Sequence, residues 1–260
     1  MRTYNVIVEP KDQAYTIFAQ SMDRTGYARG TLAPRPGMTA EVPAQERPKV
    51  LTMADMMGDM GAGGSASMHS MPGMAHARHG TSMGGGAVRV RHAATEYGPS
   101  TDMRVDTPRT NLDDPGIGLR NNGRRVLTYA DLRTIDGPID PSGPKREIEL
   151  HLTGNMERYI FGFNGLTYDQ SQPVRYPYGQ RIWVTLVNDT MMEHPIHLHG
   201  LFTELENGHG RLRPLKHTVS VKPAEKVHYY LTANELGRWA YHCHLLYHME
   251  AGMFTSAIIK

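Results

Sequence analysis

The stretch RWAYHCHLLYHMEAGM, residues 238–253, decides how the chain is interpreted, because it sets the single cysteine between two histidines. Side chains alternate between the two faces of a β-strand. If residues 238–244 are extended, His242 and His244 face one way and Cys243 faces the other. One strand then serves two metal sites that are joined by a short covalent path.

A second histidine cluster lies upstream, where residues 194–200 read HPIHLHG. Strand alternation places His197 and His199 on one face. Pro195 keeps His194 out of helical geometry and separates it from that pair. His194 is therefore free to join the cysteine.

Together the two segments offer one thiolate, two imidazoles and a weak thioether, which form the ligand set of a blue-copper electron-transfer centre. The four residues are Cys243, His194, His248 and Met253. Zinc and buried structural histidines are the alternatives. A structural zinc site more often uses several cysteines in a C-x-x-C pattern or a finger spacing, and neither occurs in the sequence. The ligand types favour copper.

At these residues the chain resembles the multicopper oxidases, whose signatures H-P-x-H-x-H-G and H-C-H-x-x-x-H-x-x-x-x-M it reproduces in order. Over nearly its whole length it is similar to the periplasmic copper-resistance oxidases of the CopA/PcoA type. That similarity rests on TNLDDPGIGLR at residues 110–120, RRVLTY at residues 124–129 and a methionine-rich insert. The resemblance implies type 1 copper at His194, Cys243, His248 and Met253, type 2 copper at His197, and the type 3 pair at His199, His242 and His244.

The resemblance also implies a function and a location. Type 1 copper takes electrons from Cu(I) or phenol-like donors, and a trinuclear cluster reduces O2 to water. His242, Cys243 and His244 are then the catalytic residues that link the two sites. The resemblance places such a protein in the periplasm.

One departure limits what the chain can do by itself. In the family, the trinuclear cluster uses eight histidines, and four of them come from two H-x-H motifs of an N-terminal cupredoxin domain. The H-x-H triplets of this sequence are residues 197–199 and 242–244. We therefore expect the C-terminal part of an oxidase, whose partner is an N-terminal cupredoxin domain with two H-x-H motifs. The alternative is a copper-binding and electron-transfer module without oxidase activity.

The composition is that of a soluble protein, with 260 residues, 39% of them hydrophobic, and a formal net charge of +2. No block of Lys and Arg indicates a nucleic-acid partner. No run of about eighteen apolar residues indicates a membrane span. Residues 1–10 predict a strand rather than a secretory leader.

The expected fold is all-β, with a Greek-key β-sandwich of cupredoxin (plastocyanin-like) type over residues 123–260. Residues 34–122, with four prolines before residue 50 and a Gly/Ser/Met/His tract, predict an irregular connector. Residues 1–33 read as the end of a second, middle cupredoxin domain, in which residues 4–8 and 14–19 form a hairpin or adjacent strands. Strands of the sandwich are expected at residues 125–129, 147–153, 181–187, 218–221, 227–231, 239–244 and 253–259.

Eight of the 17 methionines lie between residues 53 and 83. The first four, Met53, Met56, Met57 and Met60, share one face of a helix and could form an ordinary apolar stripe. Met68, Met71 and Met74 are interrupted by Pro72 and stand among histidines. Thioethers select Cu(I), so these three are weaker candidates for Cu(I) contact, with an irregular linker as the alternative.

The remaining histidines of the C-terminal half carry no metal pattern. His151, His209, His217 and His228 lie within or beside expected strands and read as surface or structural residues. No phosphate-binding loop or serine-hydrolase elbow occurs, which sets the nucleotide-binding and hydrolase classes aside.

Overall fold

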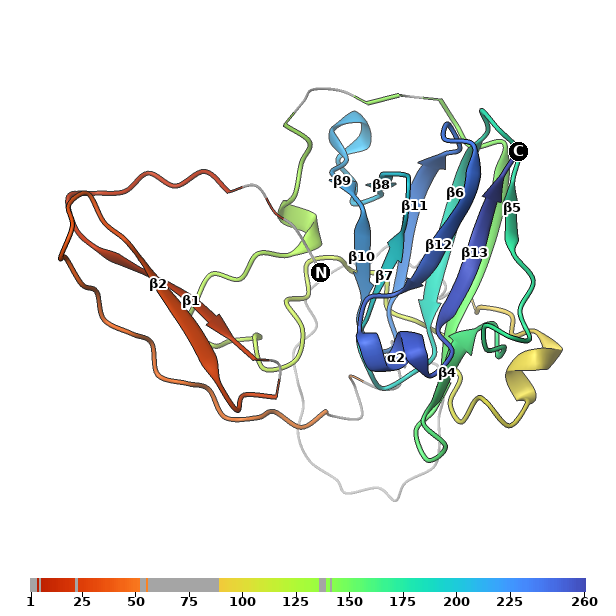
Figure 1. Ribbon diagram of the computed structural model, residues 1–260, viewed down its shortest axis with the longest axis horizontal. Coiled ribbons are helices and arrows are strands. Elements are labelled where there is room, and N and C mark those ends of the chain that lie inside the picture. The colour runs from red at the N-terminus through yellow and green to blue at the C-terminus, as the bar shows by residue number, and fades with distance from the viewer. Residues whose placement is uncertain are drawn as a thin grey trace, which may run out of the picture.

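The computed structural model describes residues 4, 6–21, 23–51, 55, 89–135, 139–140 and 142–260, and these are nearly all in strands and loops. Two sheets pack face to face in the C-terminal half (Figure 1). A separate hairpin lies to one side of them. It pairs β1 (Tyr15–Gln20) with β2 (Tyr27–Leu32).

The larger sheet has six strands in the order β4-β3-β6-β11-β8-β9. β3 and β6 run parallel, and the other pairs are antiparallel. The strands are β3 (Arg146–Asn155), β4 (Ile160–Phe163), β6 (Arg181–Asn188), β8 (Thr203–Leu205), β9 (Leu215–Lys216) and β11 (Lys226–Thr232).

The smaller sheet has five strands in the order β10-β7-β12-β13-β5, with β5 and β13 parallel. It carries both histidine segments, since β7 and β12 are hydrogen-bonded neighbours. The strands are β5 (Val174–Tyr176), β7 (His194–Leu198), β10 (Thr218–Val221), β12 (Gly237–Cys243) and β13 (Phe254–Ile259).

The core lies between the two sheets. In β11 the buried residues Val227, Tyr229 and Leu231 alternate with half-buried ones, as expected for a strand with one face on the core. β7 alternates in the same way, because His194, Ile196 and Leu198 are buried and the residues between them are not. A histidine, His194, thus takes a core position. The sandwich keeps the side chains on its inner face fixed by close packing.

The expected all-β sandwich of cupredoxin type is confirmed, and most expected strands lie within a few residues of their expected bounds. The strand expected at residues 125–129 is wrong. The Thr128 N–H and hydroxyl both donate to Asp131, at 2.8 Å, and start the short 3-10 helix η2 (Tyr129–Asp131). The buried Tyr129 hydroxyl then binds the backbone of Ser220. This local capping overrides the apolar pattern.

The N-terminal hairpin also differs from the expectation. Its first strand is near the expected position, but its partner is residues 27–32 and not residues 4–8. Backbone bonding between Ser21 and Gly26 closes a tight turn between the two strands. All six residues of β2 are exposed, so its sequence shows no alternation.

The methionine tract, including Met68, Met71 and Met74, lies outside the described residues, as do Met53, Met56, Met57 and Met60. In the part of the chain that the structure describes, no helix is long and apolar enough to span a bilayer.

Candidate metal centre

The segment after β12 folds back on the strand that it leaves. Residues 246–250 form the short helix α2 (Leu246–Glu250), visible at the end of β12 in Figure 1. The Met253 N–H then donates to the His248 carbonyl at 2.9 Å, and the Cys243 N–H donates to the Met253 carbonyl at 3.0 Å. The chain closes a loop that brings Cys243, His248 and Met253 to one place.

Gly252 is required for this loop. Its φ is +118°, in the region that favours glycine, and an added Cβ would lie 2.5 Å from the Phe161 carbonyl oxygen. The loop is therefore pressed against β4 at this point.

The neighbouring strand β7 brings His194 to the loop. β7 and β12 are antiparallel, with Cys243 opposite Ile196, and the His244 N–H donates to the Pro195 carbonyl. Cys243 Sγ lies 3.7 Å from His194 Nδ1 and 3.8 Å from His248 Nδ1, and the two nitrogens are 3.1 Å apart. Cys243, His194 and Met253 have no exposed surface, and His248 has almost none. We call Cys243, His194, His248 and Met253 the closed group.

The spacing of the three donor atoms fits one metal ion. A metal bonded at about 2.0 Å to nitrogen and about 2.3 Å to sulfur, with trigonal angles of about 120°, holds the sulfur about 3.7 Å from each nitrogen and the two nitrogens about 3.5 Å apart. The measured sulfur–nitrogen distances are 3.7 and 3.8 Å. One thiolate and two imidazoles are also the trigonal donor set of blue copper. The residues present therefore fit copper.

Burial sets the protonation of the closed group. It lowers the pKa of His248 to about 4 and holds the pKa of His194 well below the usual value, so both imidazoles are neutral at pH 7. Burial also raises the pKa of the Cys243 thiol to about 12. A thiolate without a cation is thus strongly disfavoured, and a bound cation would supply the missing positive charge.

A hydrogen-bond chain behind His194 fixes its orientation. Thr190 donates its hydroxyl proton to the Asn188 side-chain oxygen at 2.9 Å, and therefore accepts from His194 Nε2–H at 2.6 Å. The Asn188 amide donates in turn to the carbonyls of Met192 and Val221. Because Nε2 carries the proton, the lone pair of His194 lies on Nδ1, which faces the sulfur. No sequence signal singled out Thr190 or Asn188.

On the other face of β12 four histidines gather, and we call His197, His199, His242 and His244 the open group. His242 pairs with His197 across the strands. Ring centroids of contacting pairs in this group are 4.5 to 5.9 Å apart. His199 and His244 are exposed and His197 is half-buried, so the group opens to the surface.

Backbone carbonyls orient two rings of the open group. His197 Nδ1–H donates to the His217 carbonyl at 2.6 Å, and His242 Nδ1–H donates to the Cys243 carbonyl at 2.8 Å. Each ring therefore keeps its lone pair on Nε2. His242 Nε2 lies 3.1 Å from His199 Nε2. Burial, with the neighbouring histidines, lowers the pKa of His197 to about 4, which keeps this imidazole neutral and available to a metal.

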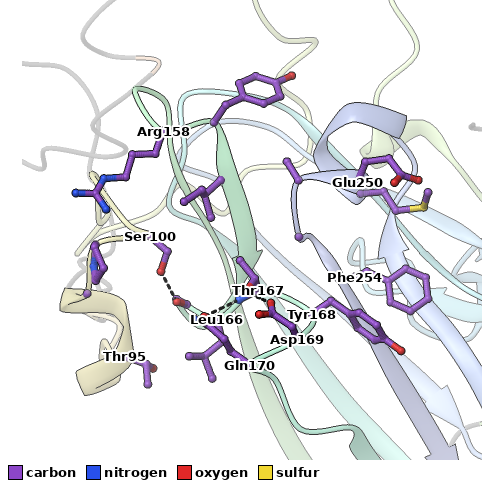
Figure 2. Close-up of a pocket in the computed structure, with 18 residues that line it drawn as sticks. Thr95, Ser100, Arg158, Leu166, Thr167, Tyr168, Asp169, Gln170, Glu250 and Phe254 are labelled. Carbon is purple, nitrogen blue, oxygen red and sulfur yellow. Dashed lines mark hydrogen bonds between the residues drawn. The ribbon is translucent and has the colours of Figure 1, made fainter.

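The aromatic residues that line a surface pocket (Figure 2) include two that contact the closed and open groups. Tyr159 lines the pocket and meets the His248 ring edge-on, at 6.5 Å between centroids. Phe254 also lines the pocket and stacks on the His242 ring, at 5.6 Å between centroids. Glu250 and Met249, next to His248 in sequence, also line it. The cavity gives a molecule from solvent access to the neighbourhood of both groups.

Comparison with known proteins points to the same family that the two histidine motifs resemble. Residues 141–260 match the family model described as "Multicopper oxidase". The chain is 50% identical to Copper resistance protein A of Escherichia coli, over 99% of this chain and 48% of that protein. It is 49% identical to the Copper resistance protein A homolog of Pseudomonas syringae pv. tomato, over 99% of this chain and 46% of that protein.

The chain thus spans about half the length of the curated relatives it matches. Among solved structures it is similar to a laccase from Pediococcus acidilactici, with 25% identity and a TM-score of 0.42, over 48% of this chain and 29% of that one.

Proposed function

Because the chain belongs to the multicopper oxidase family, we propose that it is the copper-binding C-terminal part of a copper-resistance oxidase. Copper is the cofactor of this family. The observation that carries the proposal is the closed group, in which the sulfur lies from each of the two nitrogens at the spacing of a single trigonal copper ion. We assign type 1 copper to Cys243, His194, His248 and Met253.

The protein's own residues prepare this site. Thr190 fixes the His194 lone pair on Nδ1, and Phe161 stacks on the His248 ring at 4.1 Å between centroids. Complete burial of Met253 excludes water from the group. Bound copper supplies one-electron chemistry at this site and, in the trinuclear cluster, the reduction of O2 to water.

Cys243 links the two groups. Its side chain is part of the closed group, while its chain neighbours His242 and His244 belong to the open group. The thiolate is therefore joined to both imidazoles by a short path of backbone and side-chain bonds. We assign His197 to type 2 copper, and His199, His242 and His244 to the type 3 pair. Electrons taken up at Cys243 would pass along this covalent path.

The open group supplies four of the eight histidines of a trinuclear cluster. Its exposure at the end of the sheet supports completion by another surface. We propose that this surface is an N-terminal cupredoxin domain carrying two H-x-H motifs, in accord with relatives about twice as long. The proposed electron donors are Cu(I) and phenol-like molecules, the acceptor is O2, and the location is the periplasm.

The methionine tract belongs to the same proposal. Met68, Met71 and Met74, with the neighbouring histidines, form a soft ligand set suited to Cu(I) rather than Cu(II). We propose that they collect cuprous ions for oxidation at the closed group.

A second candidate function is a copper-binding and electron-transfer module without oxidase activity. The observation that favours it is the open group, since the 260-residue sequence contains only two H-x-H triplets and both lie there. The two functions differ in whether oxygen is consumed.

The deciding experiment is oxygen uptake with Cu(I) as donor. The 260-residue chain, loaded with copper, should consume oxygen at close to the rate of buffer with Cu(I). Addition of a separately produced N-terminal cupredoxin domain with two H-x-H motifs should raise the rate, and the same domain with both motifs changed to Gln-x-Gln should not. Sustained uptake by the chain alone would refute the need for a second domain. No uptake in any mixture would favour the module.

A further inference from the structure

Two imidazoles and two carboxylates meet in the interior, outside the closed and open groups. His92 and Glu96 come from the segment around the 3-10 helix η1 (Ala94–Tyr97), His151 is in β3, and Asp189 directly follows β6. The four side chains have exposed fractions of 0 to 3%. One donor atom from each lies within 4.8 Å of the other three.

The distances between the four donor atoms are those of a compact group. Glu96 Oε2 lies 2.8 Å from His92 Nδ1 and 3.2 Å from His151 Nδ1. Asp189 Oδ2 lies 2.6 Å from His151 Nδ1 and 3.6 Å from His92 Nδ1. A tetrahedral ion bonded at about 2.0 to 2.1 Å to each atom spaces them by about 3.3 Å. The measured distances bracket that value.

In each carboxylate, the oxygen that does not face the imidazoles accepts a backbone hydrogen bond. Asp189 Oδ1 accepts the Val105 N–H at 2.7 Å, and Glu96 Oε1 accepts the Ala93 N–H at 3.3 Å. The remaining oxygens, Oδ2 and Oε2, are the ones that face the imidazoles. Backbone bonds therefore orient both carboxylates toward the centre.

Each imidazole has a further carboxylate on its outer side. His151 Nε2 lies 3.2 Å from Glu149 Oε1, and His92 Nε2 lies 3.5 Å from Asp106 Oδ1. His92 Nε2 is buried and has no hydrogen bond among the described residues. Metal-binding histidines commonly direct the nitrogen that does not bind the metal to such a carboxylate, which fixes the lone pair on the other nitrogen. His151 has this arrangement, and at His92 the outer carboxylate of Asp106 lies slightly beyond hydrogen-bond distance.

The charge of the group can be balanced by a divalent cation. Two buried carboxylates need two positive charges. Burial by itself lowers the pKa of His151, but the hydrogen bond to Asp189 and the negative charges of Asp189 and Glu96 outweigh it and raise the pKa to about 8. A divalent ion would supply both charges and, on binding His151, would displace the proton that this imidazole carries.

We propose that His92, Glu96, His151 and Asp189 form a binding site for a divalent transition-metal ion of the Zn²⁺ type, separate from the copper sites. Two imidazoles and two carboxylates in a buried, four-coordinate arrangement suit Zn²⁺ better than the oxygen-preferring Ca²⁺ or Mg²⁺. Since two ligands come from residues 92–96 and two from the sandwich, the ion would fasten this segment to β3 and the end of β6.

The test is a zinc count. The metal-free 260-residue chain is mixed with excess Zn²⁺, passed through a desalting column, and analysed for zinc per chain. We expect the unchanged protein to retain one zinc more than either Glu96→Gln or His92→Gln. Glu147→Gln, an exposed carboxylate on the same strand as His151, and His228→Gln, a histidine outside the group, are the controls and should retain the full count. Equal counts in all five proteins would overturn the proposal.

A second measurement uses the unchanged protein and so does not depend on how a variant folds. Zn²⁺ should slow amide hydrogen exchange in residues 89–106, because an ion bound to the sandwich reduces local opening of that segment. In Glu96→Gln the same addition should leave exchange in this segment unchanged. Zinc-independent exchange of residues 89–106 in the unchanged protein would show that the four residues are only a proton-sharing ion-pair network.

Discussion

The closed and open groups lie on opposite faces of the same strand, yet their surroundings differ. Cys243, His194 and Met253 have no exposed surface, whereas His199 and His244 reach solvent. The closed group has its donors, its orienting hydrogen bonds and its burial within one domain. The open group has oriented donors, but its residues His199 and His244 are exposed to solvent. The two groups thus differ in burial, and on the proposed function this is the difference between a site complete within the domain and one completed by a second surface.

The largest expected effect comes from removing the sulfur. Cys243→Ser should abolish the intense visible band of blue copper, because the band needs the thiolate. His244→Gln, one residue further on but in the open group, should leave the band intact. Absorption spectra and copper per chain, with circular dichroism to verify the fold, measure this. A blue Cys243→Ser protein would disprove the assignment of the closed group.

The pH dependence of copper binding tests how burial controls the closed group. Between pH 5 and 8 the His248 imidazole, with a pKa of about 4, is already neutral, and the Cys243 thiol, with a pKa of about 12, is protonated. Each copper bound must therefore displace one proton, and the affinity should rise about tenfold per pH unit. Competition with a chelator at several pH values measures it. A flat profile would mean that Cys243 does not bind copper as a thiolate.

A smaller effect is expected from the hydrogen bond behind His194. Thr190→Val keeps the shape of the side chain but removes the acceptor for His194 Nε2–H, and should weaken copper binding about 10- to 100-fold. Thr185→Val is the matched control, since Thr185 bonds His228, outside both groups. Copper affinities of both variants should be compared with the unchanged protein. Equal affinities would remove the positioning role of Thr190.

The smallest change in binding is expected at the thioether. Met253→Leu keeps an apolar side chain of similar volume and should retain copper while raising its reduction potential, because the axial ligand tunes the site without anchoring it. Met249→Leu, outside the closed group, should leave the potential unchanged. A redox titration followed in the visible band measures both. A copper-free Met253→Leu protein would show that Met253 is an essential ligand instead.

Short-range patterns were sufficient for much of the fold and for the candidate ligands. Alternation predicted that Cys243 and His242 face opposite ways, and the structure places them so. Three-residue strands such as β5 and β8 are too short to show a period, so the sequence did not reveal them. The strand expected at residues 125–129 failed because a capping interaction at Thr128 is stronger locally than an apolar pattern.

Contacts between distant residues explain what the sequence could not reveal about the sites. Thr190 reads as an ordinary turn residue until the fold brings it to His194 Nε2. His92 and His151 are 59 positions apart, with no metal-ligand spacing between them. Their contact exists only because the 89–106 segment packs on β3, which the sequence does not reveal. The positions of Met68, Met71 and Met74 remain a prediction from composition.

The pairing of β7 with β12 has a consequence for how the protein tolerates insertions. His242 lies opposite His197 and Cys243 opposite Ile196, so a single ladder sets the register of both the closed and the open group. One residue inserted before Tyr241 would turn every following side chain to the other face. The sulfur would then point to solvent and an imidazole into the core, and both sites would be lost together. Two inserted residues would restore the faces but displace each ligand by one pleat, so the strand admits no change of length that spares either group.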